Sequence, residues 1–452
     1  MKYVLDQLEP VCPYGVKRLK SGEIEDLERE LDRVSQMYEA LDKIGPVRDA
    51  LSGLKDVSGT FQRLHCALGP LGEVELFELT AFVLRLKELI PLAEAYERFA
   101  PVDGALAVLD PSGSGRLSFY VEDSRSPELQ RCRRAKREIE KRLRDPDDSE
   151  NREELLARRL EAAKGEDAAL HDVYAAMTEA LRPHLPALEQ NAAAAGRLDA
   201  AIAKALLARR FGAVRPTLGG ETLILENARN PRIAEQVREF VPVTVELPRG
   251  ASVLTGANMG GKSVALQTVA LNVSLALGGY FVFCDRAVVP RFDRIEVINR
   301  DFSDDAGGLS SFGGEIVRFN AACTRFCKEG EFNLLLLDEF ARGTNAREGA
   351  AIVRGVVKYL ADKNAVALLA THYDGAAEFA ARHYQVRGLR EVDGAATPQS
   401  IEDAMDYGLI PVERGTECPR DALRVCRLLG MDPELLAEVE NEQKSEKGLD
   451  KV

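Results

Sequence analysis

The sequence predicts an α + α/β protein, in which a helical N-terminal region precedes an α/β region built on a parallel sheet. Two observations predict this division. Residues 1–212 carry apolar side chains three and four positions apart, which is the period of an α-helix. From residue 213 onward, short apolar runs alternate with helical patterns, as in parallel sheets. We therefore expect a helical domain at 1–212, an α/β domain at 213–400 and a C-terminal segment at 401–452.

The first hundred residues predict a helical bundle. One helical run begins near Ile24, and a second covers 74–92, with Gly45–Pro46 and Gly69–Pro70 as breaks between helices. Residues 101–127 change character, because two apolar runs flank a polar DPSGSG turn. This pattern predicts a small hairpin.

Residues 128–210 predict two long helices on either side of a break at residues 145–148, the second running from Asn151 to Phe211. The first helix is rich in basic residues: Arg131, Arg133, Arg134, Lys136, Arg137, Lys141, Arg142 and Arg144. It could present a basic stripe to nucleic acid, or it could be a solvated helix in which Glu138 and Glu140 are interleaved. The arginines are spread around the helix, which favours the solvated helix.

A glycine-rich turn joins a predicted strand to a predicted helix at 252–263, SVLTGANMGGKS. Its spacing is G-x-x-x-x-G-K-S, the phosphate-binding loop. Glycines let backbone N–H groups turn toward phosphates, and the following helix presents its N-terminus to negative charge. We expect the loop to consist of Gly256, Ala257, Asn258, Met259, Gly260, Gly261, Lys262 and Ser263. Lys262 would contact the β- and γ-phosphates of ATP, and the Ser263 hydroxyl would ligate Mg²⁺.

Two further apolar strands end in residues suited to phosphate chemistry. NLLLLDEF, 333–340, ends in Asp338, the expected second Mg²⁺ ligand, and Glu339, which would orient or deprotonate the attacking water. The strand 365–370 is followed by His372, which would contact the γ-phosphate. The carboxyl ends of parallel strands share one edge, so we expect these residues to meet there.

Composition limits the function classes. A net charge of −13 argues against a protein that coats nucleic acid, although it leaves room for a local basic surface. Tryptophan is absent and aromatics are only 6%, which disfavours a platform for stacking unpaired bases. No apolar run approaches the ~20 residues of a membrane span, so we expect no membrane partner. The eight cysteines form no C-x-x-C pair, and reduced thiols beside a nucleotide site indicate the cytoplasm.

Taken together, these motifs resemble those of the MutS family of ABC-type ATPases. TGANMGGKS, 255–263, closely matches the family's phosphate loop, LLLLDEFARGTN resembles its LVLMDEIGRGTS segment, and ATHYD resembles its ATHY histidine loop. SSFGGE at 310–315 resembles the signature STFMVE, Asp304 and Asp305 resemble the paired aspartates before it, and Arg229–Asn230–Pro231 stands where the family usually has Arg-His-Pro. Residues 407–436 resemble the family's C-terminal helix-turn-helix, and 1–212 more weakly resemble its core and lever domain.

The resemblance implies a composite active site. In this family two ATPase domains pair head to tail, so Ser310 and Ser311 of one chain would complete the nucleotide site of the other. A homodimer or heterodimer is therefore expected, with 401–452 contributing to dimerisation. By position, Phe240 could stack on the adenine, although it could equally be a core residue before Pro242.

The resemblance also leaves two functions open. The family's mismatch readers carry Phe-x-Glu on a wedge domain, and none of the 17 phenylalanines here has Glu two residues later. We therefore expect a short form without the mismatch-recognition and connector domains. It could be an ATPase that binds mismatched, branched or distorted DNA, or an ATP-driven chaperone-like factor that reactivates a cobalamin-dependent aminomutase or acts on another protein client.

Overall fold

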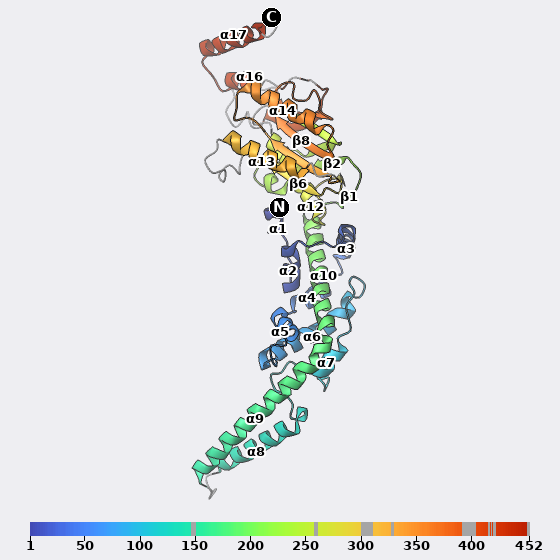
Figure 1. Cartoon of the computed structure of the whole chain (residues 1–452), viewed down its shortest axis with the longest axis vertical. Coiled ribbons are helices and arrows are strands. Elements are labelled where there is room, and N and C mark those ends of the chain that lie inside the picture. Colours follow the sequence, from blue (N-terminus) through green and yellow to red (C-terminus); the bar gives the residue numbers. More distant parts are fainter. Residues whose placement is uncertain are drawn as a thin grey trace. The chain divides into compact units, whose positions relative to one another are not determined.

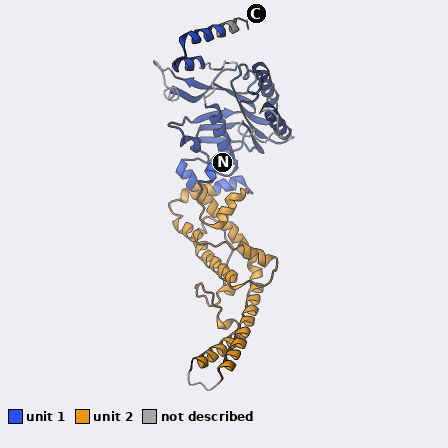
Figure 2. Ribbon diagram, turned by 90° about the vertical axis from the view of Figure 1, so that its left-hand side faces the viewer, with its two compact units in different colours: residues 1–8, 24–32, 206–452 blue, residues 9–23, 33–205 orange. Residues whose placement is uncertain are grey.

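The computed structural model describes residues 1–145, 151–256, 261–299, 311–326, 330–390, 404–414, 416, 418 and 422–449. The chain divides into two compact units (Figure 2). Unit 1 contains residues 1–8, 24–32 and 206–452, and unit 2 contains residues 9–23 and 33–205.

Unit 2 is built from helices (Figure 1). Helices α3 and α10 each have residues in both units. The helices of this region are α2 (Pro13–Ser21), α3 (Leu27–Ala40), α4 (Gly45–Ser52), α5 (Ser58–His65), α6 (Glu73–Ala93), α7 (Asp103–Leu109), α8 (Pro127–Arg144), α9 (Arg152–Leu181) and α10 (Leu185–Phe211), with 3₁₀ turns at η1 (Asp123–Arg125) and η2 (Arg182–His184).

Helix α6 shows why the periodic segments fold as predicted. Its buried side chains recur every three or four residues: Leu76, Leu79, Phe82, Val83, Leu86 and Leu89. The Glu75 carboxylate accepts a hydrogen bond of 2.7 Å from the Gly72 N–H, which satisfies one of the unpaired donors at the start of the helix.

The predicted hairpin at 101–127 is wrong. Residues 103–109 form helix α7, and residues 110–122 contain no strand. The cause is burial on a helical period, because Ala105, Leu106 and Leu109 all pack inside. A short apolar run cannot by itself distinguish a strand from one turn of buried helix.

The single helix expected from Asn151 to Phe211 is also interrupted. Helix α9 ends at Leu181, and the 3₁₀ turn η2 contains Pro183 before α10 begins at Leu185. Proline lacks the N–H that would continue the hydrogen-bond ladder, so the break follows from the residue itself.

Unit 1 contains two sheets. The six-stranded sheet has the order β10-β9-β4-β8-β7-β6. Its adjacent strands pair in parallel, except that β10 is antiparallel to β9. Its strands are β4 (Gly250–Thr255), β6 (Arg294–Ile298), β7 (Asn333–Asp338), β8 (Ala365–Thr371), β9 (His383–Leu389) and β10 (Met405–Pro411). The four-stranded sheet has the order β1-β5-β2-β3, from β1 (Thr217–Leu218), β2 (Leu223–Ala228), β3 (Val243–Leu247) and β5 (Arg286–Val289).

Helices cover both faces of the central strands. Every residue of β4 and β8 is buried, which explains their uninterrupted apolar sequences. Apolar residues of α14 pack on one face of the sheet, in a cluster that includes Val353, Val357 and Leu360. The helices of unit 1 are α1 (Lys2–Leu5), α11 (Pro231–Ala234), α12 (Lys262–Leu277), α13 (Ser311–Phe326), α14 (Ala346–Leu360), α16 (Ala422–Leu428) and α17 (Pro433–Leu449). The predicted mixture of helical and α/β structure is confirmed, whereas the helix-turn-helix at the C-terminus stays a prediction.

None of the helices in the described residues is long and apolar enough to cross a membrane.

Candidate functional site

The predicted site residues meet at the carboxyl edge of the six-stranded sheet. Thr255 at the end of β4 is in register with Thr371 of β8, and Asp338 of β7 is in register with Ala370. The parallel pairing therefore brings together the start of the predicted phosphate loop, the carboxylates after β7 and the histidine after β8. In open α/β sheets this edge is where ligands bind.

Two glycines bound the predicted phosphate loop. Gly256 and Gly261 have φ values of +153° and +77°, which disfavour any other residue. A Cβ on Gly256 would lie 3.0 Å from the Cβ of Val386, and one on Gly261 would lie 2.9 Å from the Cδ1 of Tyr407. The backbone thus requires glycine at both ends of the loop. Ala257, Asn258, Met259 and Gly260 lie outside the described residues.

Lys262 begins helix α12 and is buried, with 3% of its surface exposed. Its Nζ donates a hydrogen bond of 2.8 Å to the Gly256 carbonyl and lies 3.7 Å from the Glu339 Oε1. Burial lowers the pKa of this ammonium, and the carboxylates of Glu339 and Asp338 oppose that shift. Such a buried cation at a helix N-terminus is suited to binding an anion. Ser263 follows it and is half-buried.

Asp338 and Glu339 lie at the end of β7. Asp338 is the last residue of the strand and is half-buried, and its charge acts on Lys262. Glu339 has a φ of +50°, and its N–H donates to the Ala370 carbonyl at 3.0 Å. The side chain of Glu339 is 13% exposed and pairs with both Lys262 and Arg342.

His372 follows β8 directly. Its Nδ1 is buried and has no hydrogen-bond partner within the described part of the chain. Burial lowers the pKa of the ring, and the Glu339 carboxylate opposes the change. The imidazole is therefore neutral near pH 7 and keeps a buried polar atom that a phosphate group could satisfy.

The described residues do not establish the roles of the three remaining predicted contacts, Ser310, Ser311 and Phe240. Ser310 lies outside the described residues, and Ser311 is the first residue of α13, with a side chain that is not described. Phe240 is half-buried in the segment before β3. The roles of all three stay predictions.

The side chains present suit ATP and Mg²⁺. The glycine-bounded loop, the buried Lys262 and the unpartnered Nδ1 of His372 match the needs of a triphosphate. Where the structure describes the chain, no cluster of three or more His, Cys, Asp and Glu side chains could hold a metal alone. Ser263 and Asp338 would supply oxygen ligands, and Mg²⁺ in nucleotide sites takes its other ligands from phosphates and water.

Sequence reasoning missed two residues that support this edge. His383 on β9 is 3% exposed, and its Nε2 lies 2.8 Å from the Thr255 Oγ1, directly before the predicted loop. Arg342 pairs with Glu339 from three positions further along the chain. Arg342 lies within the LLLLDEFARGTN segment, but that resemblance assigned it no role, and His383 belongs to no motif. The three-dimensional contacts identify both.

The basic residues of α8 are largely committed to partners within unit 2. Arg133 is buried and pairs with Asp123 at 2.7 Å and with Glu166 at 3.0 Å. Lys136 pairs with the same Glu166 at 2.6 Å, and Arg137 pairs with Asp123 at 2.6 Å. These ion pairs weaken the interpretation of a stripe facing nucleic acid, but Arg133 is buried in a network with other elements rather than solvated.

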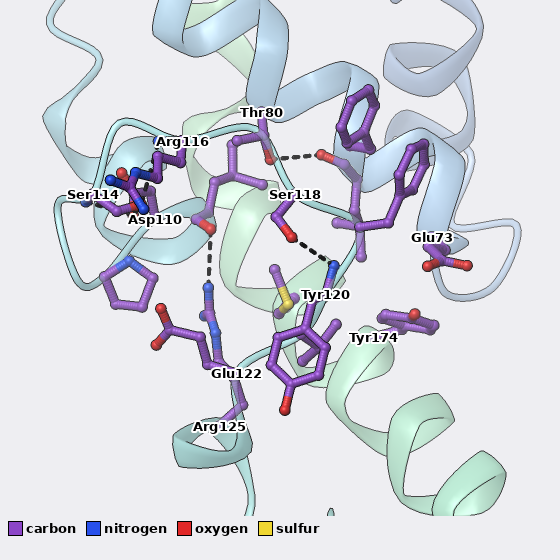
Figure 3. Close-up of a pocket in the computed structure, with 17 residues that line it drawn as sticks. Glu73, Thr80, Asp110, Ser114, Arg116, Ser118, Tyr120, Glu122, Arg125 and Tyr174 are labelled. Carbon is purple, nitrogen blue, oxygen red and sulfur yellow. Dashed lines mark hydrogen bonds between the residues drawn. The ribbon is translucent and has the colours of Figure 1, made fainter.

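A cavity of about 320 Å³ lies in unit 2 beside α6 and α7 (Figure 3). Two of its charged side chains are already satisfied. The guanidinium of Arg125 donates to the carbonyls of Val108 and Leu109, and the carboxylate of Asp110 accepts from the N–H groups of Ser114 and Gly115. The cavity is therefore a structural feature separate from the sheet edge.

Comparisons with known proteins agree with the geometry of the sheet edge. The family model described as MutS domain V matches residues 252–441. This range includes Lys262, Glu339 and His372. This part of the chain is similar to the MutS family. The DNA mismatch repair protein MutS of Natronomonas pharaonis is 34% identical over 252 residues, or 53% of this chain. The proteins of the same name from Thermus aquaticus and Lactobacillus gasseri are 36% identical over 202 residues and 29% identical over 287 residues.

The similarity covers only part of each relative. The matched stretches span 29%, 24% and 32% of the three MutS proteins, and 53%, 45% and 62% of this chain. The MutS similarity is thus concentrated in the C-terminal half, where the sheet edge lies.

Proposed function

We propose that this MutS-type protein binds and hydrolyses ATP with Mg²⁺ at the carboxyl edge of the six-stranded sheet. The observation that carries the proposal is the convergence of Lys262, Glu339 and His372 at that edge, inside the region that matches MutS domain V. A buried cation, a carboxylate and a neutral imidazole around a glycine-bounded turn form the set of groups that phosphoryl transfer to water needs.

In the proposed reaction, a water oxygen forms a bond to the γ-phosphorus while the bond from that phosphorus to the β–γ bridging oxygen breaks. Glu339 orients the water and accepts its proton, and ADP leaves with the bridging oxygen. Lys262 and His372 bind oxygens of the γ-phosphate and stabilise the charge that they carry in the transition state. Bound Mg²⁺, held through Ser263 and Asp338, would neutralise phosphate charge.

We further propose that the active protein is a homodimer, or a heterodimer with a related subunit. The motif at 310–315 supports this, because Ser310 and Ser311 would complete the site of the opposite subunit. Phe240 would contact the adenine. ATP turnover would then depend on subunit association.

DNA is the proposed effector of this ATPase. The support is the similarity to proteins named DNA mismatch repair protein MutS. The paired residues Arg133, Lys136 and Arg137 are poor candidates for phosphate contacts, because binding DNA would break their internal ion pairs. We therefore expect DNA to contact other basic side chains.

The test is to measure ATP hydrolysis and DNA binding together. Duplex, mismatched and four-way-junction DNA are titrated at two salt concentrations, since phosphate contacts weaken as salt rises. Stimulated hydrolysis with a salt-dependent affinity that differs among the three DNAs would support the proposal. ATP turnover that is indifferent to all three would contradict the DNA assignment and favour a protein client.

A further inference from the structure

The turn after β7 is held in an unusual backbone conformation. Glu339 and Ala341 have φ values of +50° and +64°, in the left-handed region that residues with a side chain rarely adopt. The Tyr373 hydroxyl donates to the Ala341 carbonyl at 3.0 Å, and the Ala341 N–H donates to the Glu315 Oε2 at 3.1 Å. Strain of this kind persists only where the surroundings fix it.

Gly349 leaves space for the contact between the Tyr373 hydroxyl and the Ala341 carbonyl. A Cβ on Gly349 would lie 2.3 Å from the Tyr373 hydroxyl and 3.0 Å from the Ala341 carbonyl oxygen. Helix α14 can therefore approach the turn only with glycine at this position. The backbone that carries Glu339 is thus fixed from two sides.

The carboxylate of Glu339 lies between two cations. Its Oε1 is 3.7 Å from the Lys262 Nζ, and its Oε2 accepts a hydrogen bond from the Nη1 of Arg342. If the Lys262 ammonium binds the phosphates of ATP, its contact with the Glu339 carboxylate weakens. Once the ammonium is drawn to the phosphates, Arg342 is the cation that still contacts Glu339.

We propose that Arg342 is a positioning residue for hydrolysis, which orients the Glu339 carboxylate toward the attacking water. The inference deepens the proposed ATPase function and rests on it. A general base works best when a third group fixes its orientation, as in catalytic triads. Arginine suits this role because its guanidinium stays charged and its planar donors fix the direction of a carboxylate.

The exposure of the two partners is consistent with this role. The Glu339 side chain is 13% exposed, whereas that of Arg342 is 41% exposed. Arg342 therefore contributes little to the apolar core, and replacing it should leave the fold intact. A loss of activity would then report on Glu339 rather than on unfolding.

The test compares steady-state ATP hydrolysis by the wild type, Arg342→Gln and Arg342→Lys. We expect kcat to fall roughly 10- to 100-fold in Arg342→Gln, because misplacing a catalytic group by about 1 Å costs on this order. The KM for ATP should change by less than about twofold, since Arg342 does not contact the phosphates in this account. Arg342→Lys should recover part of kcat. Arg347→Gln, an exposed arginine on α14, is the matched control.

A double variant separates orientation of the base from a general effect on the site. Adding Arg342→Gln to Glu339→Gln should cause no further loss, because the group that Arg342 orients is already gone. Additive losses, an unchanged kcat or a change confined to KM would each overturn the positioning role. Absence of ATP hydrolysis in the wild type would overturn the proposed function together with this inference.

Discussion

The sheet edge of unit 1 and the α8 region of unit 2 both gather charged side chains, but they differ in how those charges are satisfied. Around α8, Arg133 pairs with both Asp123 and Glu166, and these two carboxylates also pair with Arg137 and Lys136 respectively. At the sheet edge, His372 keeps a buried Nδ1 without a partner in the described chain, and Lys262 and Glu339 lie 3.7 Å apart. A dense group of charges is thus a structural network in one region and a candidate binding site in the other.

The same comparison separates two kinds of burial. Arg133 is buried among carboxylates and under the ring of Tyr120, with its guanidinium carbon 4.4 Å from the ring centre. Lys262 is buried at a helix N-terminus, beside a glycine-bounded turn. The first arrangement ties a loop to two helices, and the second places a buried positive group at a helix N-terminus, where an anion would be stabilised. Substitutions in the two regions should therefore affect different properties.

The largest expected effect is on nucleotide binding. Lys262→Ala should weaken ATP binding on the order of 1,000-fold, or about 4 kcal/mol, because it removes a desolvated cation from the phosphates. Thermal stability should change less than nucleotide affinity, since Arg342 still pairs with Glu339 when Lys262 is removed. Calorimetric titration with ATP measures the affinity, with Arg347→Ala as the exposed control. An unchanged affinity would place the phosphates elsewhere.

Arg133→Ala should have the opposite profile. Leaving Asp123 and Glu166 without their buried partner should destabilise the α8–α9 region by about 3 kcal/mol, whereas ATP binding should not change. Hydrogen exchange of the α8 and α9 amides reports this local stability. The neighbouring Arg134 is exposed, so Arg134→Ala should change it by less than about 0.5 kcal/mol. Equal effects of the two variants would contradict the network.

The smallest expected effect is a pH dependence of the same region. Hydrogen bonds from Tyr120 and Arg133 hold the pKa of Asp123 well below its ordinary value of 3.8. A carboxylate with a lowered pKa stabilises the fold fully above its unfolded-state pKa of about 3.9, and that contribution is lost progressively as the pH falls from there through the lowered folded-state pKa. Hydrogen exchange of α8 between about pH 6 and about pH 3 should show the difference between wild type and Asp123→Asn beginning to narrow at the acidic end. A difference that stays constant would disprove this.

Local patterns predicted much of the α/β unit, because its chemistry lies at strand ends. The spacing from Gly256 to Ser263, and the two carboxylates that end NLLLLDE, depend only on near neighbours in the chain. Parallel pairing then places them at one edge without further information. The family resemblance is confirmed by the match of residues 252–441 to MutS domain V, whereas the roles of the individual residues stay predictions.

Contacts between distant residues set the limit of that prediction. The left-handed turn at Glu339 depends on Tyr373 and Glu315, which no local pattern connects to it. The basic residues of α8 could be judged only after Asp123 and Glu166 were placed beside Arg133. The hairpin expected at 101–127 failed for a related reason, because burial on a helical period decided the fold of Asp103–Leu109.

The most direct test of the proposed site is single-turnover ATP hydrolysis by Glu339→Gln, measured beside its ATP affinity and its molecular mass in ATP. We expect ATP binding to persist, hydrolysis to fall at least about 100-fold through loss of the base, and an ATP-bound dimer to accumulate. Glu378→Gln, an exposed carboxylate in the same unit, should behave as the wild type. Hydrolysis by Glu339→Gln at the wild-type rate would contradict the assignment of this sheet edge as the catalytic site.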